Sequence, residues 1–149
     1  MAEPARSDGE FLGEVRARRE GLRSAMVGLE AAVSAPAPGR GDDWRVGVAR
    51  ALTRLRTAFD GHVEVTECEG GVFAQVIEDA PRLVNQVKRL HADHEAIAAA
   101  LSTVDERLAG DAEPVRDAAL DLLGLLARHR HRGADLLHEA FCVDISVGD

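Results

Sequence analysis

The sequence is poor in several residues that other classes of protein need. Aromatic residues make up only 3% of the 149-residue chain, and tyrosine is absent. β-Branched residues are sparse while alanine, leucine, arginine and glutamate abound, and this balance favours helix over sheet. No apolar run approaches the roughly 20 residues that a membrane-spanning helix needs. We therefore expect a soluble, helical protein with no role within a membrane.

Cysteine is scarce as well, and acidic residues outnumber basic ones by 26 to 18. The formal net charge is -8, and an acidic chain without a basic stripe is a poor ligand for nucleic acid or for an anionic membrane surface. The first nine residues are polar and lack the apolar segment of a signal peptide. Cys68 and Cys142 are too few for a disulfide framework and fit two reduced thiols. We expect a cytoplasmic protein, either monomeric or a homodimer.

Clusters of proline and glycine divide the chain into four stretches. They lie at residues 34–41, 69–71 and 110–114, and apolar residues recur every three or four positions between them. This spacing predicts helices over residues 8–33, 43–66, 72–108 and 114–141. Four such helices with short connections predict an all-α fold, an antiparallel up-down-up-down four-helix bundle that forms a single domain over residues 1–149.

Three of the histidines lie on the predicted inner faces of three different helices. At 100° per residue, His62, His94 and His129 continue the apolar stripes of the second, third and fourth helices. A single inward histidine is usually a hydrogen-bonded core residue. Three of them in one small core are costly to bury without partners, and neutral imidazole is the commonest metal ligand. The pattern therefore predicts a metal or ligand site that the three histidines share.

The remaining histidines are weaker candidates. His91 precedes His94 by almost one turn and is either a flanking ligand or a residue at the rim of the site. His131 and His138 lie roughly opposite His129 on the fourth helix, near Asp135, where a solvated face is the simpler interpretation.

Three segments that contain these histidines resemble a known family. They are Phe59-Asp-Gly-His-Val-Glu-Val-Thr-Glu67, Leu90-His-Ala-Asp-His94 and His129-Arg-His-Arg-Gly-Ala-Asp135. In order and spacing the chain is similar to the hemerythrin-like, or HHE cation-binding, domain of the actinobacterial type. The resemblance implies a four-helix bundle around a pair of non-haem irons, held by histidines from all four helices and by bridging carboxylates. On this basis His62, His94 and His129 match the histidines of the second, third and fourth helices.

The chain departs from that family at three positions. Arg19 replaces the expected histidine of the first helix, and Thr66 replaces the carboxylate expected four residues after His62, with Glu67 one place later. Gly133 stands where a carboxylate should follow His129, and Asp135 would need a local bulge in the helix to point inward. Arg19 either points into the core, where its charge excludes a second metal, or extends to the surface, or pairs with Glu67.

These departures leave three arrangements open. They are a di-iron centre with shifted carboxylates, a mononuclear three-histidine site, and a site that has been lost. The metal ligands we predict are His62, Glu67, His94 and His129, with His91 and Asp135 as further candidates. The expected cofactor is iron, one or two ions per chain, while zinc or manganese would suit similar donors.

The function we expect is binding or sensing of oxygen, nitric oxide or peroxide, a small diatomic ligand or an oxidant, at non-haem iron. Two alternatives remain open. One is a metal-dependent oxidase or peroxidase of a small molecule, which extra room beside the histidines would favour. The other is a metal-free helical interaction module, so the sequence does not decide whether the protein is an enzyme.

Overall fold

The chain folds into helices throughout the part that the structure describes. The computed structural model describes residues 7–37 and 41–141. The helices are, in chain order, α1 (Asp8–Ser34), α2 (Gly41–Glu67), α3 (Val72–Asp79), the short 3-10 helix η1 (Pro81–Leu83), α4 (Val84–Arg107) and α5 (Ala112–Phe141). No strand occurs among the described residues, so the prediction of an all-α fold is confirmed. Cys142, the first six residues and residues 38–40 of the first predicted connection lie outside the described part.

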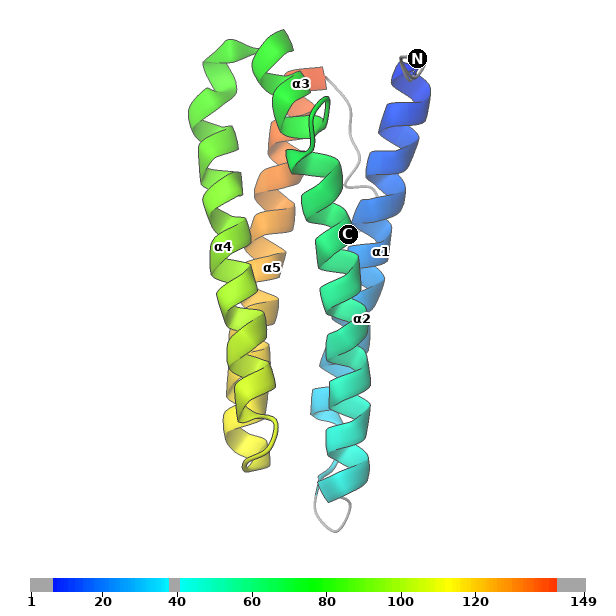
Figure 1. Cartoon of the computed structure of the whole chain (residues 1–149), viewed down its shortest axis with the longest axis vertical. Coiled ribbons are helices and arrows are strands. Elements are labelled where there is room, and N and C mark those ends of the chain that lie inside the picture. The colour runs from blue at the N-terminus through cyan, green and yellow to red at the C-terminus, as the bar shows by residue number, and fades with distance from the viewer. Residues whose placement is uncertain (1–6, 38–40, 142–149) are drawn as a thin grey trace.

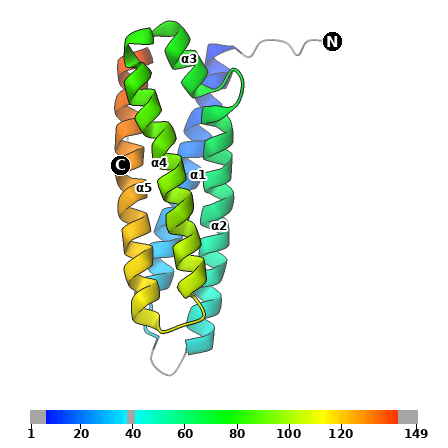
Figure 2. The ribbon, with the colours of Figure 1, turned by 60° about the vertical axis from the view of Figure 1, so that its left-hand side comes forward.

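The four long helices α1, α2, α4 and α5 lie side by side along the long axis of the molecule (Figure 1). The colours show that the chain reverses its direction from each long helix to the next (Figures 1 and 2). The short helix α3 lies at the end of the molecule where α2 finishes and α4 begins. None of the described helices is both long and apolar enough to span a bilayer.

Local sequence explains where two of the helices begin and end. The Ser7 hydroxyl accepts a hydrogen bond from the backbone N–H of Glu10, whose carboxylate accepts one from the N–H of Ser7. This reciprocal capping starts α1. At the other break, Gly70 has a φ of +73°, which glycine adopts at little cost. A Cβ atom on Gly71 would lie 2.8 Å from the carbonyl oxygen of Val65, so the turn between α2 and α3 requires glycine there as well.

The prediction of one continuous helix over residues 72–108 is wrong. The chain forms α3, leaves helical geometry at Ala80 (φ -141°, ψ 71°), and resumes through η1 into α4. Pro81 explains the break, because its ring disfavours helical geometry at the preceding residue and it has no N–H to donate. The interruption lets α3 fold over the end of the bundle as a separate element.

Two apolar clusters fill the interior. Between them lies a polar layer that is formed by Arg19, His62, His94 and His129. The first lies toward the connection between α4 and α5, and the second lies toward α3. Along α2, α4 and α5 the inward histidine separates residues of the first cluster from residues of the second, as Arg19 does along α1. The largest fully buried side chains of the first cluster are Leu22, Leu29, Leu55, Ile97, Leu122 and Leu126.

Candidate metal centre

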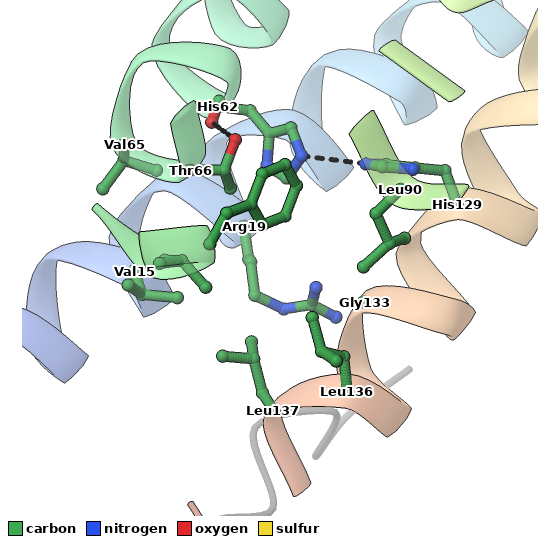
Figure 3. Close-up of a pocket in the computed structure, with 12 residues that line it drawn as sticks. Val15, Arg19, His62, Val65, Thr66, Leu90, His129, Gly133, Leu136 and Leu137 are labelled. Carbon is green, nitrogen blue, oxygen red and sulfur yellow. Dashed lines mark hydrogen bonds between the residues drawn. The ribbon is translucent and has the colours of Figure 1, made fainter. Parts of the chain in front are cut away.

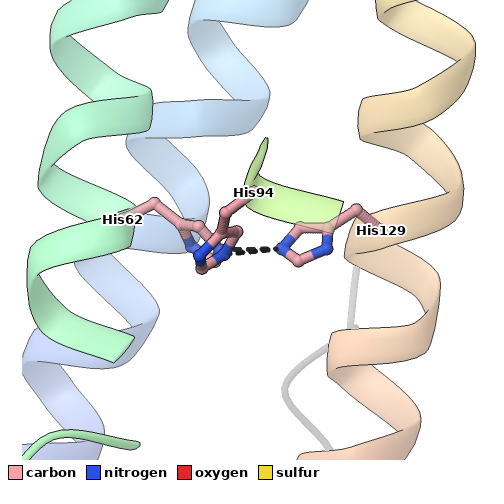
Figure 4. Close-up of side chains that lie close together, drawn as sticks. All are labelled: His62, His94 and His129. Atoms are coloured by element: carbon pink, nitrogen blue, oxygen red, sulfur yellow. Dashed lines mark hydrogen bonds between the residues drawn. The ribbon is translucent and has the colours of Figure 1, made fainter. Parts of the chain in front are cut away.

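The polar layer brings together three histidine side chains from three helices. His62 of α2, His94 of α4 and His129 of α5 are only 6%, 5% and 2% exposed. Their Nε2 atoms face one another, with His129 Nε2 lying 3.0 Å from that of His62 and 3.2 Å from that of His94 (Figure 4). The three residues form the one group of metal-ligating side chains found within the described part of the chain. The predicted convergence of these histidines is confirmed.

Carboxylates hold the outer nitrogens of two of the three rings. His94 Nδ1 lies 3.0 Å from Glu67 Oε1, and His129 Nδ1 lies 2.9 Å from Asp93 Oδ2. An ionised carboxylate can only accept a hydrogen bond, so each Nδ1 must carry the proton. In the neutral imidazole the opposite nitrogen, Nε2, then presents a bare lone pair. Glu67 and Asp93 therefore prepare His94 and His129 to donate electron pairs toward the same point.

The close approach of His94 and His129 requires a positive centre between them. Two bare Nε2 lone pairs that are 3.2 Å apart repel each other, since neither atom has a hydrogen to donate. The contact becomes favourable if one ring is protonated or if a cation lies between the nitrogens. The first remedy requires a charged imidazole in a buried layer of the bundle, which is costly.

Burial opposes protonation at all three rings. Loss of solvent lowers the pKa of His62 well below its usual value, and the neighbouring His129 and His94 lower it further. The pKa values of His94 and His129 are also lowered, again mainly by burial, although hydrogen bonds to Glu67 and Asp93 act in the opposite direction. The neutral imidazole, which is the form that binds metals, is therefore favoured at each ring.

The spacing of the nitrogens fits a single transition-metal ion. Two imidazole nitrogens bound at about 2.0–2.1 Å in tetrahedral geometry lie roughly 3.3 Å apart. The two measured Nε2 separations, 3.0 and 3.2 Å, are close to this value. Carboxylates that accept hydrogen bonds from the outer ring nitrogens are the usual second layer of such sites. The donor set on its own therefore suits a metal with three protein ligands and an open position.

Aromatic rings hold the centre in place from two sides. The ring of Phe73, in α3, stacks on His94 with centroids 5.6 Å apart. The ring of Phe59 meets His94 edge to face at 5.7 Å. These contacts restrict the rotation of His94 and shield it from water. They also give α3 a role, because this short helix contributes one wall of the site.

A small cavity of about 20 Å³ adjoins the histidines on the side of α1 (Figure 3). Arg19, Thr66 and Gly133, the three departures from the family pattern, all line it together with His62 and His129. Thr66 and Gly133 each lie one helical turn beyond an inward histidine, and Thr66 donates its hydroxyl hydrogen within its own helix, to the carbonyl oxygen of His62.

Arg19 points into the bundle, which is one of the three orientations that the sequence left open. Its side chain is only 6% exposed. Nη2 donates a hydrogen bond to the carbonyl oxygen of Arg130 at 3.3 Å. A Cβ atom at Gly133 would lie 3.3 Å from Nη1, so the absence of a side chain there makes room for the guanidinium.

The other predicted ligands lie outside the group of three. Glu67 accepts hydrogen bonds behind the ring of His94 and from His91, whose Nδ1 lies 2.7 Å from Oε1. The side chain of His91 is 56% exposed, at the rim of the site. The side chain of Asp135 is 63% exposed, and its Oδ2 lies 3.7 Å from Nε2 of the exposed His131. The helix α5 runs through this region without the bulge that would bring Asp135 inward.

Sequence reasoning missed Asp93. This residue holds His129 and also receives the guanidinium of Arg132, whose Nη1 lies 3.2 Å from Oδ1. The signal was present in the segment Leu90-His-Ala-Asp-His94, where an acidic residue directly precedes the inward histidine. A residue one position earlier is rotated by about 100° and so faces the neighbouring helix rather than the core. Its partner becomes evident only when α4 and α5 are known to be adjacent.

Comparison with known proteins does not identify the chain. No family model, no curated protein and no solved structure matches it. The resemblance to hemerythrin-like domains therefore remains a prediction from short motifs, and the geometry of the centre is the basis for any functional conclusion.

Proposed function

We propose that this protein is an antiparallel four-helix bundle that binds one metal ion through the Nε2 atoms of His62, His94 and His129. The observation that carries the proposal is the approach of His94 Nε2 to His129 Nε2, 3.2 Å apart, while carboxylates hold both outer nitrogens. A metal cation removes the repulsion between the two lone pairs without requiring a buried imidazolium. This argument favours the mononuclear arrangement over a site that has been lost.

The buried guanidinium of Arg19 favours one metal over two. Arginine stays protonated in proteins, so its charge persists beside the cavity. Two unit charges that are 4 Å apart interact by about 4 kcal/mol at an effective dielectric constant of 20, and a divalent ion doubles that repulsion. A second metal would also need donors, and Thr66 and Gly133 provide no carboxylate where one is expected. A di-iron centre is therefore the less favourable arrangement.

Iron is the metal that we propose, in the ferrous state. Three neutral imidazoles suit iron, zinc, copper or nickel better than manganese, which prefers oxygen donors. A centre of this kind supplies an open coordination position at which a small ligand binds. The same donors would hold zinc, and the carboxylates behind His94 and His129 are common in zinc sites. Metal analysis separates the two.

The size of the cavity favours a diatomic ligand over a larger substrate. About 20 Å³ holds one or two water-sized groups. Most of the lining is apolar, with Val15, Phe73 and Leu136 among its residues. Such a pocket suits oxygen, nitric oxide or peroxide better than a larger organic molecule. The geometry therefore supports small-ligand binding or sensing more than oxidation of an organic substrate.

The test is an anaerobic titration of metal-free protein with Fe²⁺, followed by nitric oxide. We expect one Fe²⁺ per chain and a new visible absorption band when nitric oxide is added. His94→Ala should lose both, whereas His131→Ala should keep both, because the side chain of His131 is 81% exposed and points away. If His94→Ala binds iron and nitric oxide as well as the wild type does, the centre has been assigned wrongly.

A further inference from the structure

A chain of three side chains connects the buried centre with the surface of the bundle. His129 Nδ1 lies 2.9 Å from Asp93 Oδ2, and Nη1 of Arg132 lies 3.2 Å from Oδ1 and 3.4 Å from Oδ2 of the same carboxylate. The exposed fraction of the side chain rises outward, from 2% for His129 to 21% for Asp93 and 53% for Arg132. The chain crosses between the neighbouring helices α4 and α5, which lie side by side in both views (Figures 1 and 2).

The orientation of the Asp93 carboxylate needs a partner of this kind. The terminal torsion of an aspartate side chain has a broad preference, so the backbone does not fix the plane of the carboxylate. A donor that lies within hydrogen-bond distance of both oxygens restricts that plane, and such a bond is strong when both partners are charged. Because arginine keeps its proton in proteins, Arg132 provides this restraint permanently. With Oδ1 and Oδ2 both engaged, Oδ2 stays directed at His129.

The carboxylate behind His94 is held in a different way. Oε1 of Glu67 lies 3.0 Å from Nδ1 of His94 and 2.7 Å from Nδ1 of His91, so a single oxygen faces both rings. The outer partner there is an imidazole, which is charged only when it is protonated. The outer partner of Asp93 is a permanent cation that spans both of its oxygens. Among the two carboxylates, Asp93 therefore has the firmer external support.

We propose that Arg132 is a positioning residue of the metal centre, which acts through Asp93 to keep the Nε2 lone pair of His129 directed at the metal. The inference rests on the proposed metal centre and adds an exposed residue that sets its affinity. A ring and a carboxylate that already have the required orientation lose less conformational freedom when the metal binds. Groups that hold metal ligands from behind raise the affinity of such sites for this reason.

The charge of Arg132 also acts in the opposite direction, because a cation repels a metal ion. Two features make this repulsion the weaker effect. The side chains of Asp93 and His129 stand between the guanidinium and the proposed metal position. The side chain of Arg132 is more than half exposed, so water and salt screen its charge. Removal of Arg132 should therefore lower the metal affinity rather than raise it.

The experiment is a double-mutant cycle on the full chain, in which competition with a chromophoric chelator gives the affinity for Zn²⁺. Arg132→Met removes the charge and the donors, and Arg128→Met makes the same change at an exposed position one turn earlier on α5. We expect Arg132→Met to weaken binding about three- to tenfold, less than the loss of the carboxylate itself, and Arg128→Met to have no effect. Arg132→Lys, which restores a charged N–H donor, should recover part of the loss. In an Asp93→Asn background, Arg132→Met should change the affinity by less than about twofold, because the connection is already broken.

Each other result has a distinct meaning. An Arg132→Met protein that binds Zn²⁺ as tightly as the wild type, or more tightly, would overturn the positioning role and leave the metal centre standing. The same holds for an equal loss with and without Asp93, for no recovery in Arg132→Lys, and for an equal loss in Arg128→Met, since packing or general charge would then explain the effect. Failure of the wild type to bind Zn²⁺ would overturn the metal centre, and the role of Arg132 with it. If Arg132→Met does not fold, Arg132→Ala takes its place in the cycle with the same expected results.

Discussion

The interior of this bundle contains two regions built on opposite principles. The apolar cluster toward the α4–α5 connection consists of side chains such as Leu55, Leu122 and Leu126, none of which is exposed at all. The polar layer above it holds His62, His94, His129 and Arg19, which are almost as deeply buried. Burial of the first group stabilises the fold. Burial of the second costs free energy unless partners are present.

Under the proposed function, the difference marks where the protein exchanges stability for metal binding. An apolar layer at the same level would have been the simpler way to fill the core. The chain instead places three imidazoles there, with Glu67 and Asp93 aligning two of them. We expect such an arrangement to lower the stability of the metal-free protein and to become favourable when a cation binds. The two regions should therefore respond differently to mutation, pH and metal.

The largest effect should follow from removing one histidine of the polar layer. His129→Ala deletes the nitrogen that contacts both of its neighbours, so we expect the affinity for metal to fall by more than about a hundredfold. His138→Ala, on the same helix but outside the layer, should bind metal as the wild type does. Isothermal titration calorimetry with Zn²⁺ measures both. Loss of metal from His138→Ala and its retention by His129→Ala would reverse the assignment of faces on α5.

A deletion in the apolar cluster should affect stability and spare the metal. Leu122 is fully buried, so Leu122→Ala should lower the free energy of unfolding by about 2–5 kcal/mol through lost contacts and a new cavity. Leu120, 56% exposed on the same helix, is the matched control, and Leu120→Ala should change stability by less than about 0.5 kcal/mol. Urea denaturation measures both changes. The folded Leu122→Ala protein should bind the same number of metal ions per chain as the wild type, and a reduced number would link the two regions more tightly than proposed.

Changes behind the histidines should have intermediate effects. Asp93→Asn removes the carboxylate that fixes the proton of His129 on Nδ1, and we expect the metal affinity to fall by about 10- to 100-fold. Asp121→Asn, at an exposed position of α5, makes the same charge change away from the site and should have no effect. Competition with a chromophoric chelator gives both affinities. An affinity that is equal in the two variants would show that Asp93 only pairs with Arg132.

The smallest effect concerns pH. In the unfolded chain histidine titrates near pH 6.5, whereas burial lowers the pKa of His62, His94 and His129 in the folded protein. Below about pH 6.5 the unfolded chain therefore binds more protons, and the free energy of unfolding falls as the pH decreases. We expect metal-free protein to lose on the order of 1–2 kcal/mol between pH 7.5 and 5.5. Urea denaturation of wild type and of His62→Leu measures the loss, which should be smaller in the variant. A loss of equal size in both would assign the pH dependence to other groups.

The periodicity of the sequence was sufficient to predict most of the fold. Apolar spacing located α1, α2 and α5 to within a few residues, because each buries one continuous stripe. The break at Ala80 was not predicted, since Pro81 is acceptable in the first turn of a helix and equally able to end the previous one. The packing of Phe73 against His94, which the sequence did not indicate, then places α3 beside the site.

The site was predictable to the extent that helical faces determine it. The inward faces of α2, α4 and α5 placed His62, His94 and His129 together. Periodicity within one helix says nothing about which residues meet across two helices, so Asp93 was missed and Glu67 was expected in the first layer. The inward position of Arg19 could not be chosen from the sequence either, because a long side chain at the edge of a stripe can turn to either side.

The measurement that tests the account most directly is the ratio of metal to protein. Inductively coupled plasma mass spectrometry gives this ratio for freshly purified protein. It also gives the ratio for metal-free protein that has been reloaded with Fe²⁺ under nitrogen. Three neutral imidazoles beside one fixed guanidinium predict a ratio of one ion per chain. They also predict that Arg19→His, which removes the permanent charge and adds a nitrogen donor, raises the ratio toward two. A wild-type ratio of two would contradict the mononuclear centre, and a wild type that binds no metal would contradict the metal centre altogether.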